Sequence, residues 1–132
     1  MTGVLQLLKF VWAGPNSLLG LCVGAIGVVF GGSVRRRGRT LEFYGGGTHW
    51  FVNRLPGGQF TLALTLGHTI LGQTDASLDI ARNHELVHVA QYERWGPFFL
   101  PAYFTSSIYL WMIGRDPYRD NPFEREAYAL DP

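Results

Sequence analysis

Cysteine and charged residues are scarce in this sequence. Cys22 is the only cysteine among 132 residues, which excludes an intramolecular disulfide and any zinc site built from several cysteines. Charged residues make up 16% of the chain, whereas typical domains contain roughly 25%. The formal net charge is +1, so the sequence does not show the broad basic face that binds nucleic acid. We therefore expect no nucleic-acid partner.

Apolar residues and glycine are abundant instead. Hydrophobic residues make up 47% of the chain, and 17 residues are glycine. A length of 132 residues suits one compact domain with its own core and is too short for two. Together with the shortage of charge, this composition points to contact with a membrane.

The most apolar part of the sequence lies at its N-terminus. Residues 4–13 carry Lys9 as their only charge, residues 14–17 (Gly-Pro-Asn-Ser) interrupt the chain, and residues 18–34 are uncharged. The uncharged run is at the lower end of the length that crosses a bilayer. Three arginines at 35–37 follow it directly. If the run spans, the positive-inside tendency places the rest of the chain, with any catalytic part, in the cytoplasm.

We interpret residues 1–34 as an apolar helical hairpin, spanning or re-entrant, that is associated with a membrane. Residues 35–132 would then form the remaining unit. Two other interpretations stay open for the N-terminal segment: a pair of helices buried in, or lying on, a soluble protein, and a cleaved signal peptide.

The middle of the sequence has a pattern typical of a small β-sheet. Residues 40–44 and 49–52 are typical of strands and are separated by three glycines. Residues 60–66 alternate between polar and apolar side chains, and residues 69–71 can continue the sheet beyond Gly67-His68. We expect a short, mostly antiparallel sheet between about residue 40 and residue 72.

Helices are predicted for the second half of the chain. One begins between Asp75 and Ser77 and runs to Trp95, where Gly96 and Pro97 end it. A second, nearly uncharged helix covers 101–113. The last begins at Asn121-Pro122, with asparagine as cap and proline in the first turn, and runs to Leu130.

The motif that carries chemistry is His84-Glu85-Leu86-Val87-His88, which matches H-E-x-x-H. Residues four apart lie on one face of a helix, so both imidazoles can bind one zinc ion (Zn2+) at about 2.0–2.1 Å. Glu85 lies beside that face and is the candidate general base for a metal-bound water. A surface helix with unrelated histidines is the alternative interpretation.

Two histidines and a water leave room for a third protein ligand. Glu124 and Glu126 are the downstream candidates, because His49 and His68 lie upstream in the expected sheet. Two histidines and a carboxylate suit several divalent ions, so iron or manganese stays an alternative to zinc.

Two further residues are candidates for the catalytic chemistry. His68, near a strand end, can stabilise an oxyanion, or it is a partly exposed histidine of the sheet. Tyr128, one helical turn beyond Glu124, can donate a hydrogen bond to the same oxyanion, or it packs in the core.

Residues 77–130 resemble the gluzincins, the zincin metallopeptidases whose third ligand is a glutamate on a later helix. The run Glu124-Arg125-Glu126-Ala127-Tyr128 is similar to the Glu-x-x-Ala-Asp pattern of the membrane-bound branch that includes the CAAX prenyl endopeptidases. The resemblance favours Glu124 as ligand. Tyr128 stands where that branch has aspartate, so the support that this aspartate gives a ligating histidine must come from elsewhere or be absent.

Small bacterial zincin-like proteins are a second resemblance, carried by residues 88–97 and 120–124. The resemblances imply an α+β fold: a small zincin-like domain with a short antiparallel sheet, the H-E-x-x-H helix and a C-terminal ligand helix, preceded by the apolar hairpin. They imply zinc-dependent hydrolysis of a peptide bond in a peptide or protein substrate.

Two other classes of function remain as alternatives. The first is a non-catalytic binding or scaffold module in which zinc only holds the helices together. The second is a small structural membrane protein in which the histidine motif is incidental.

Overall fold

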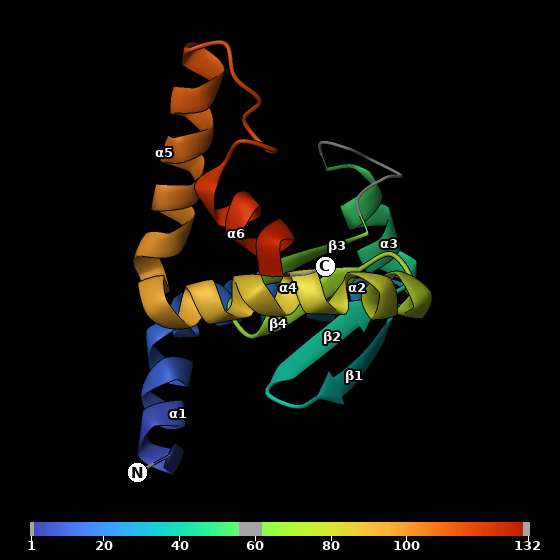
Figure 1. Cartoon of the computed structure of the whole chain (residues 1–132). Coiled ribbons are helices and arrows are strands. Elements are labelled where there is room, and N and C mark those ends of the chain that lie inside the picture. Colours follow the sequence, from blue (N-terminus) through green and yellow to red (C-terminus); the bar gives the residue numbers. More distant parts are fainter. Residues whose placement is uncertain (1, 56–61, 131–132) are drawn as a thin grey trace.

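The computed structural model describes residues 2–55 and 62–130. These residues form helices and a sheet in an α+β arrangement (Figure 1). The helices are α1 (Thr2–Trp12), α2 (Gly14–Val29), α3 (Gly46–Asn53), α4 (Asp75–Trp95), α5 (Phe99–Met112) and α6 (Pro122–Leu130), with the 3-10 turn η2 (Gly96–Phe98) between α4 and α5. The strands are β1 (Ser33–Arg37), β2 (Thr40–Tyr44), β3 (Ala63–Leu66) and β4 (Thr69–Gly72).

The four strands form a mixed sheet in the order β1-β2-β4-β3. β1 pairs with β2 and β3 with β4 in antiparallel fashion, whereas the central pair, β2 and β4, is parallel. Two of the three pairings are thus antiparallel, in keeping with the mostly antiparallel sheet that the sequence predicts, and only the central pairing of the described sheet differs. A parallel pair needs a crossover connection between its strands, and α3 lies within that connection.

Helix α3 replaces the strand predicted at 49–52, which is a correction to the sequence interpretation. Gly45 and Gly46 have φ values of 72° and 48° and turn the chain out of the sheet directly after β2. The backbone N–H of His49 then donates to the carbonyl of Gly45, which begins the helix. A short apolar run cannot be assigned to strand or helix by its periodicity alone. Residues 60 and 61 of the other predicted strand lie outside the described residues.

The sheet lies between α2 on one face and α4 on the other. Ile70 of β4 packs in one core cluster with Leu78 and Val89 of α4. Its neighbour Leu71 packs in a different cluster with Phe43, on the side of α2. Successive side chains of a strand point to opposite faces. All four residues of β4 are buried, so this strand is covered on both sides.

Glycines allow α2 to lie directly on the sheet. A Cβ atom at Gly24 would come within 2.5 Å of the Phe43 ring, and one at Gly20 would meet Thr69. The structure shows that these glycines admit the sheet.

The N-terminal segment forms two helices that meet at a bend beside the buried Ala13. Within the described part of the chain, no single helix has both the length and the apolar character to cross a bilayer. Residues 3–12 and 14–29 meet those criteria only as a pair bent by 67°. The arginines at 35–37 lie in β1. The membrane-associated hairpin at 1–34 stays a prediction.

The helices of the second half lie where the sequence predicts them. The hydroxyl of Thr74 accepts a hydrogen bond from the backbone N–H of Ser77 at 3.0 Å and caps α4. Gly96, with a φ of 56°, ends that helix. Helices α5 and α6 differ from the predicted ranges by two residues or fewer at each end.

Candidate functional site

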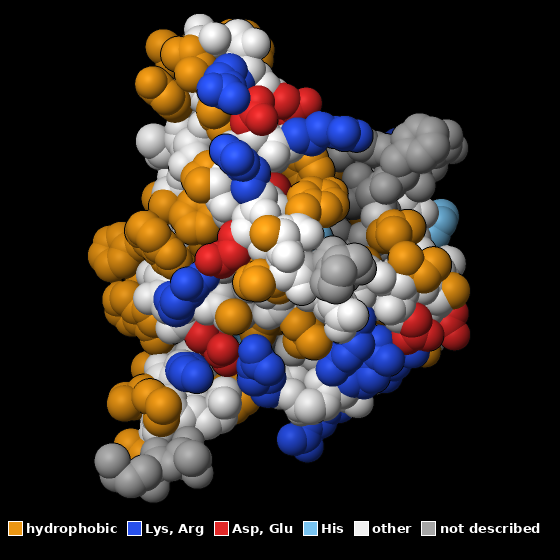
Figure 2. Space-filling view, in the orientation of Figure 1, with side chains coloured by type: hydrophobic (Ala, Val, Ile, Leu, Met, Phe, Trp, Pro, Cys, Tyr) orange, Lys and Arg blue, Asp and Glu red, His pale blue; other side chains and the backbone are white. Residues whose placement is uncertain are grey.

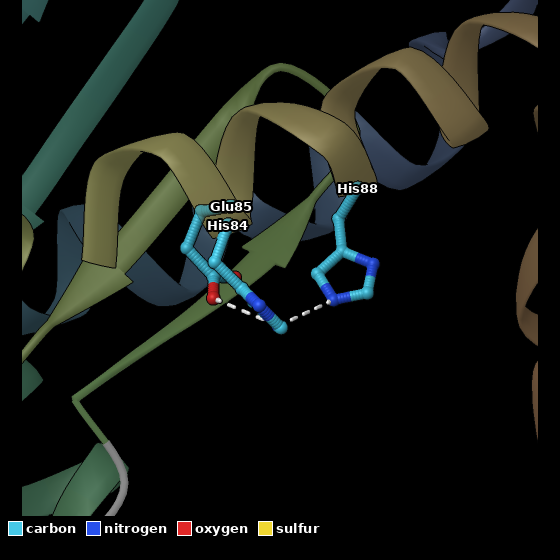
Figure 3. A group of neighbouring side chains, drawn as sticks. All are labelled: His84, Glu85 and His88. Atoms are coloured by element: carbon cyan, nitrogen blue, oxygen red, sulfur yellow. Dashed lines mark hydrogen bonds and ion pairs between the residues drawn. The ribbon is translucent and has the colours of Figure 1, made fainter. Parts of the chain in front are cut away.

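Helix α4 places His84, Glu85 and His88 on the side that faces the interior (Figure 3). Their exposed fractions are 8%, 6% and 5%, and one ligand atom of each lies within 4.8 Å of the others. Figure 3 shows the three side chains pointing to a common space below the helix. The described structure therefore contains a buried His-Glu-His group that can hold a metal ion.

Glu124 of α6 completes this group. Its Oε1 atom lies 3.0 Å from Nε2 of His84 and 3.0 Å from Nε2 of His88, and the two Nε2 atoms are 3.2 Å apart. Glu126 points elsewhere, and its Oε1 accepts hydrogen bonds from Arg94 and Gln91. Of the two carboxylates proposed as third ligand, Glu124 is the one that meets the histidines.

The start of α6 is fixed by Asn121, which determines where Glu124 reaches. The Oδ1 atom of Asn121 accepts from the backbone N–H of Phe123 at 2.9 Å and caps the helix. Its Nδ2 group donates to the carbonyl of Tyr103 and to the hydroxyl of Ser107, both on α5. Asn121 is fully buried. One side chain therefore starts α6 and joins it to α5.

Gln91 orients His88. Its Oε1 atom lies 2.8 Å from Nδ1 of the imidazole, and its Nε2 donates to the carbonyl of Phe123. Because an amide oxygen only accepts, this contact places a proton on Nδ1 and leaves the Nε2 lone pair of His88 for a metal. Gln91 thus holds the His88 ring in place from within the same helix.

Two more hydroxyl groups bind the carboxylates of the site. The Tyr103 hydroxyl donates to Oε2 of Glu124 at 2.6 Å, and the Thr65 hydroxyl donates to Oε1 of Glu85 at 2.8 Å. Sequence reasoning missed both roles. Tyr103 carries no sign of it among the other aromatic residues of α5, and Thr65 lies in a strand whose partners only the fold reveals.

The charges of the site are strongly coupled. Burial raises the pKa of Glu85. Burial alone would lower the pKa of His88, but its hydrogen bond to Glu124 and the nearby carboxylates raise that pKa to about 9. The two histidines lower the pKa of Glu124 to about 2 against the opposing effect of burial. Glu124 therefore carries the negative charge that binds a cation, and a metal ion would displace a proton from His88.

The Tyr103→Phe substitution is expected to lower zinc affinity by about 10–100-fold, the usual effect of losing a residue that orients a ligand. The phenyl ring keeps the packing of Tyr103 and removes only the hydrogen bond to Glu124. Tyr109→Phe is the matched control, because Tyr109 is on the same helix and 61% exposed. Competition titration with a chromophoric chelator gives both affinities. Equal affinity in both variants would contradict the role of Tyr103.

Of the other two predicted site residues, Tyr128 lies beside the histidine pair and His68 does not. The ring of Tyr128 packs against His84 with 4.4 Å between centroids, and its hydroxyl lies 2.9 Å from that of Tyr118. His68 instead pairs with Glu93 at 2.8 Å and packs against Phe10. Tyr128 thus lies at the histidine pair, whereas the contacts of His68 are with another part of the molecule.

No family model, curated protein or solved structure compared with this chain matches it. The function is therefore inferred from the geometry of the site and from the two sequence motifs.

Proposed function

We propose that this protein is a zinc-dependent hydrolase of the gluzincin type that cleaves peptide bonds. The observation that carries the proposal is the triangle formed by Nε2 of His84, Nε2 of His88 and Oε1 of Glu124, with edges of 3.2, 3.0 and 3.0 Å.

The donor set fits zinc. Ligands about 2.0–2.1 Å from a tetrahedral zinc ion lie roughly 3.3 Å from one another. The three observed edges are close to that value, so the side chains need only small movements to bind the ion. Three protein ligands with a fourth position left for water are typical of catalytic zinc sites, whereas structural sites use four protein ligands.

Glu85 is the proposed general base. Zinc, when bound, lowers the pKa of a water in the fourth position to about 7 and polarises the substrate carbonyl. The Oε1 atom of Glu85 is held by Thr65, and its Oε2 atom lies 4.0 Å from Nε2 of His84, beside the ligand triangle. Burial favours the protonated form of this carboxyl group. Glu85 would accept a proton from the water and pass it to the leaving amine.

A polypeptide substrate can pair with β3. This strand is the outer one of the described sheet on the side that contacts α4, and an extended peptide can extend a sheet at such an edge. β4 is paired on both sides and offers no free edge. Tyr128, whose ring packs against His84, would donate to a developing oxyanion. His68 would need to leave Glu93 to do so.

A zinc-stabilised module without turnover is the second candidate. The observation in its favour is that Glu124 joins α6 to α4 while the two histidines are only 8% and 5% exposed. In that case the ion would hold two helices together, and Glu85 would be dispensable.

Removal of the metal tests the proposal. The purified chain is expected to contain one zinc ion, to cleave members of an unstructured peptide library, to lose this activity on treatment with a chelator and to regain it with added zinc. Elemental analysis and mass spectrometry of the peptide products give the two readouts. Stoichiometric zinc without cleavage would favour the module. If the chain binds no zinc even when the ion is added, the remaining interpretation is a small structural membrane protein.

A further inference from the structure

Helix α1 is oriented with its apolar side away from the protein. The two most polar side chains of its interior, Gln6 and Lys9, are its half-buried ones. Val4, Leu7 and Val11 are 62%, 61% and 67% exposed. A surface helix of a water-soluble domain normally shows the reverse arrangement, with its apolar stripe toward the core.

Helix α2 has the same inverted arrangement. The residues that it buries are small or polar, namely Asn16, Gly20, Gly24 and Gly27. Its large side chains point outward, and Leu18, Ile26 and Val29 are 63%, 60% and 80% exposed. Small residues toward the protein and large apolar residues outward are typical of helices that face lipid.

Helix α5 buries Phe99 in the core, whereas much of the rest of the helix presents large apolar side chains to the outside. Its range contains no charged residue. Ser107 faces inward and bonds to Asn121, whereas Phe104, Ile108 and Trp111 are 56%, 58% and 71% exposed. All three helices thus present large apolar side chains to the outside.

The exposed side chains of α1 and α5 form a continuous surface. The ring of Trp12, at the end of α1, lies 6.0 Å from that of Phe98, directly before α5. Figure 1 shows the two helices extending in opposite directions from the same end of α4, and Figure 2 shows hydrophobic side chains along this margin. We call this surface the apolar band; it consists of Val4, Leu7, Leu8, Val11, Trp12, Phe98, Phe104, Ile108, Trp111 and Met112.

We propose that the apolar band is a docking surface for a lipid bilayer, on which α1 and α5 lie in the interface. This proposal goes beyond the hydrolase function and does not depend on it. Interfacial helices bury one apolar side in the boundary between headgroups and acyl chains, and tryptophan prefers that depth. Trp12 and Trp111 lie within the band.

A fluid partner fits this surface better than a second copy of the chain. Trp111, Met112 and Ile113 are 71%, 71% and 50% exposed. Consecutive helical residues point about 100° apart, so these three surround the end of α5. A rigid protein surface covers one side of a projecting helix, whereas lipid can surround it.

Flotation with vesicles tests the proposal. The full chain, purified in mild detergent and diluted into phosphatidylcholine vesicles, is expected to float with them in a density gradient. The double variant Leu7→Asp/Ile108→Asp should bind at least tenfold more weakly, because each substitution replaces a buried apolar group by a charge and costs about tenfold. Ile80→Asp is the matched control, since Ile80 is 71% exposed on α4, outside the band.

Quenching by brominated lipid checks the orientation. Bromine near the ester end of the acyl chains should quench a larger fraction of the emission in Trp50→Phe than in wild type, because Trp50 lies on α3, outside the band, and contributes emission that is not quenched. Trp111→Phe should lose part of the quenching. Circular dichroism establishes that the variants are folded. Equal flotation of all variants would overturn the proposal. So would a wild type that does not bind vesicles and instead forms a dimer, if the band substitutions dissociate that dimer.

Discussion

The Glu85→Gln variant is expected to keep one zinc ion per chain and to hydrolyse peptides about 10²–10⁴-fold more slowly than the wild type. Glutamine has nearly the same shape as glutamate and can still accept the hydrogen bond of Thr65. It cannot accept a proton from water at neutral pH. The three atoms of the ligand triangle belong to other residues, so metal content should not change. Single-turnover hydrolysis and elemental analysis on the same preparation measure both effects.

Glu126→Gln is the matched control for this substitution. Glu126 is also close to the site, but its carboxylate binds Arg94 and Gln91 and does not contact the histidines. Its variant should hydrolyse peptides at nearly the wild-type rate. If Glu85→Gln retained full activity with zinc in place, Glu85 would not be the base and the hydrolytic mechanism would be wrong.

Replacing Glu124 by alanine should lower zinc affinity by more than about 100-fold, because even residues that only support a ligand contribute about 10–100-fold. The substitution also leaves the Tyr103 hydroxyl without its partner and removes the contact that joins α6 to the two histidines. His84→Ala should have an effect of the same order. Isothermal titration of the metal-free proteins with zinc gives the affinities.

The comparison of Glu124→Ala with Glu126→Ala decides which carboxylate is the ligand. Glu126→Ala is expected to bind zinc nearly as tightly as wild type. Its only expected effect near the site is the loss of one hydrogen bond from Gln91. Thermal unfolding adds a second readout. Zinc should raise the midpoint of wild type and Glu126→Ala, since a ligand bound only to the folded state stabilises it, and should leave Glu124→Ala nearly unchanged. The reverse result would assign the ligand to Glu126.

Local signals in the sequence were enough to predict the metal-binding helix. The predicted start between Asp75 and Ser77 and the predicted stop at Gly96 match the ends of α4, and the spacing of His84 and His88 puts both on one face. Similarly, Asn121 and Pro122 mark the beginning of α6. These features depend on neighbours along the chain, so they can be read without the fold.

Features that depend on distant parts of the chain could not be predicted. The pairing of β2 with β4 is parallel because the chain crosses over through α3, and the apolar run 49–52 is equally compatible with a strand. The choice of Glu124 rested on a resemblance. Its geometric reason lies in Asn121, which joins α6 to α5 through Tyr103 and Ser107.

Adjacent residues of α5 connect the proposed metal site with the apolar band. Tyr103 points inward and holds Glu124, whereas Phe104 points outward and is 56% exposed. A bilayer that fixes the position of α5 would also fix the tyrosine that orients the third ligand. Linkage requires reciprocity between two such equilibria. If lipid binding changes the affinity of the triangle for zinc by some factor, zinc changes the affinity of α5 for lipid by the same factor.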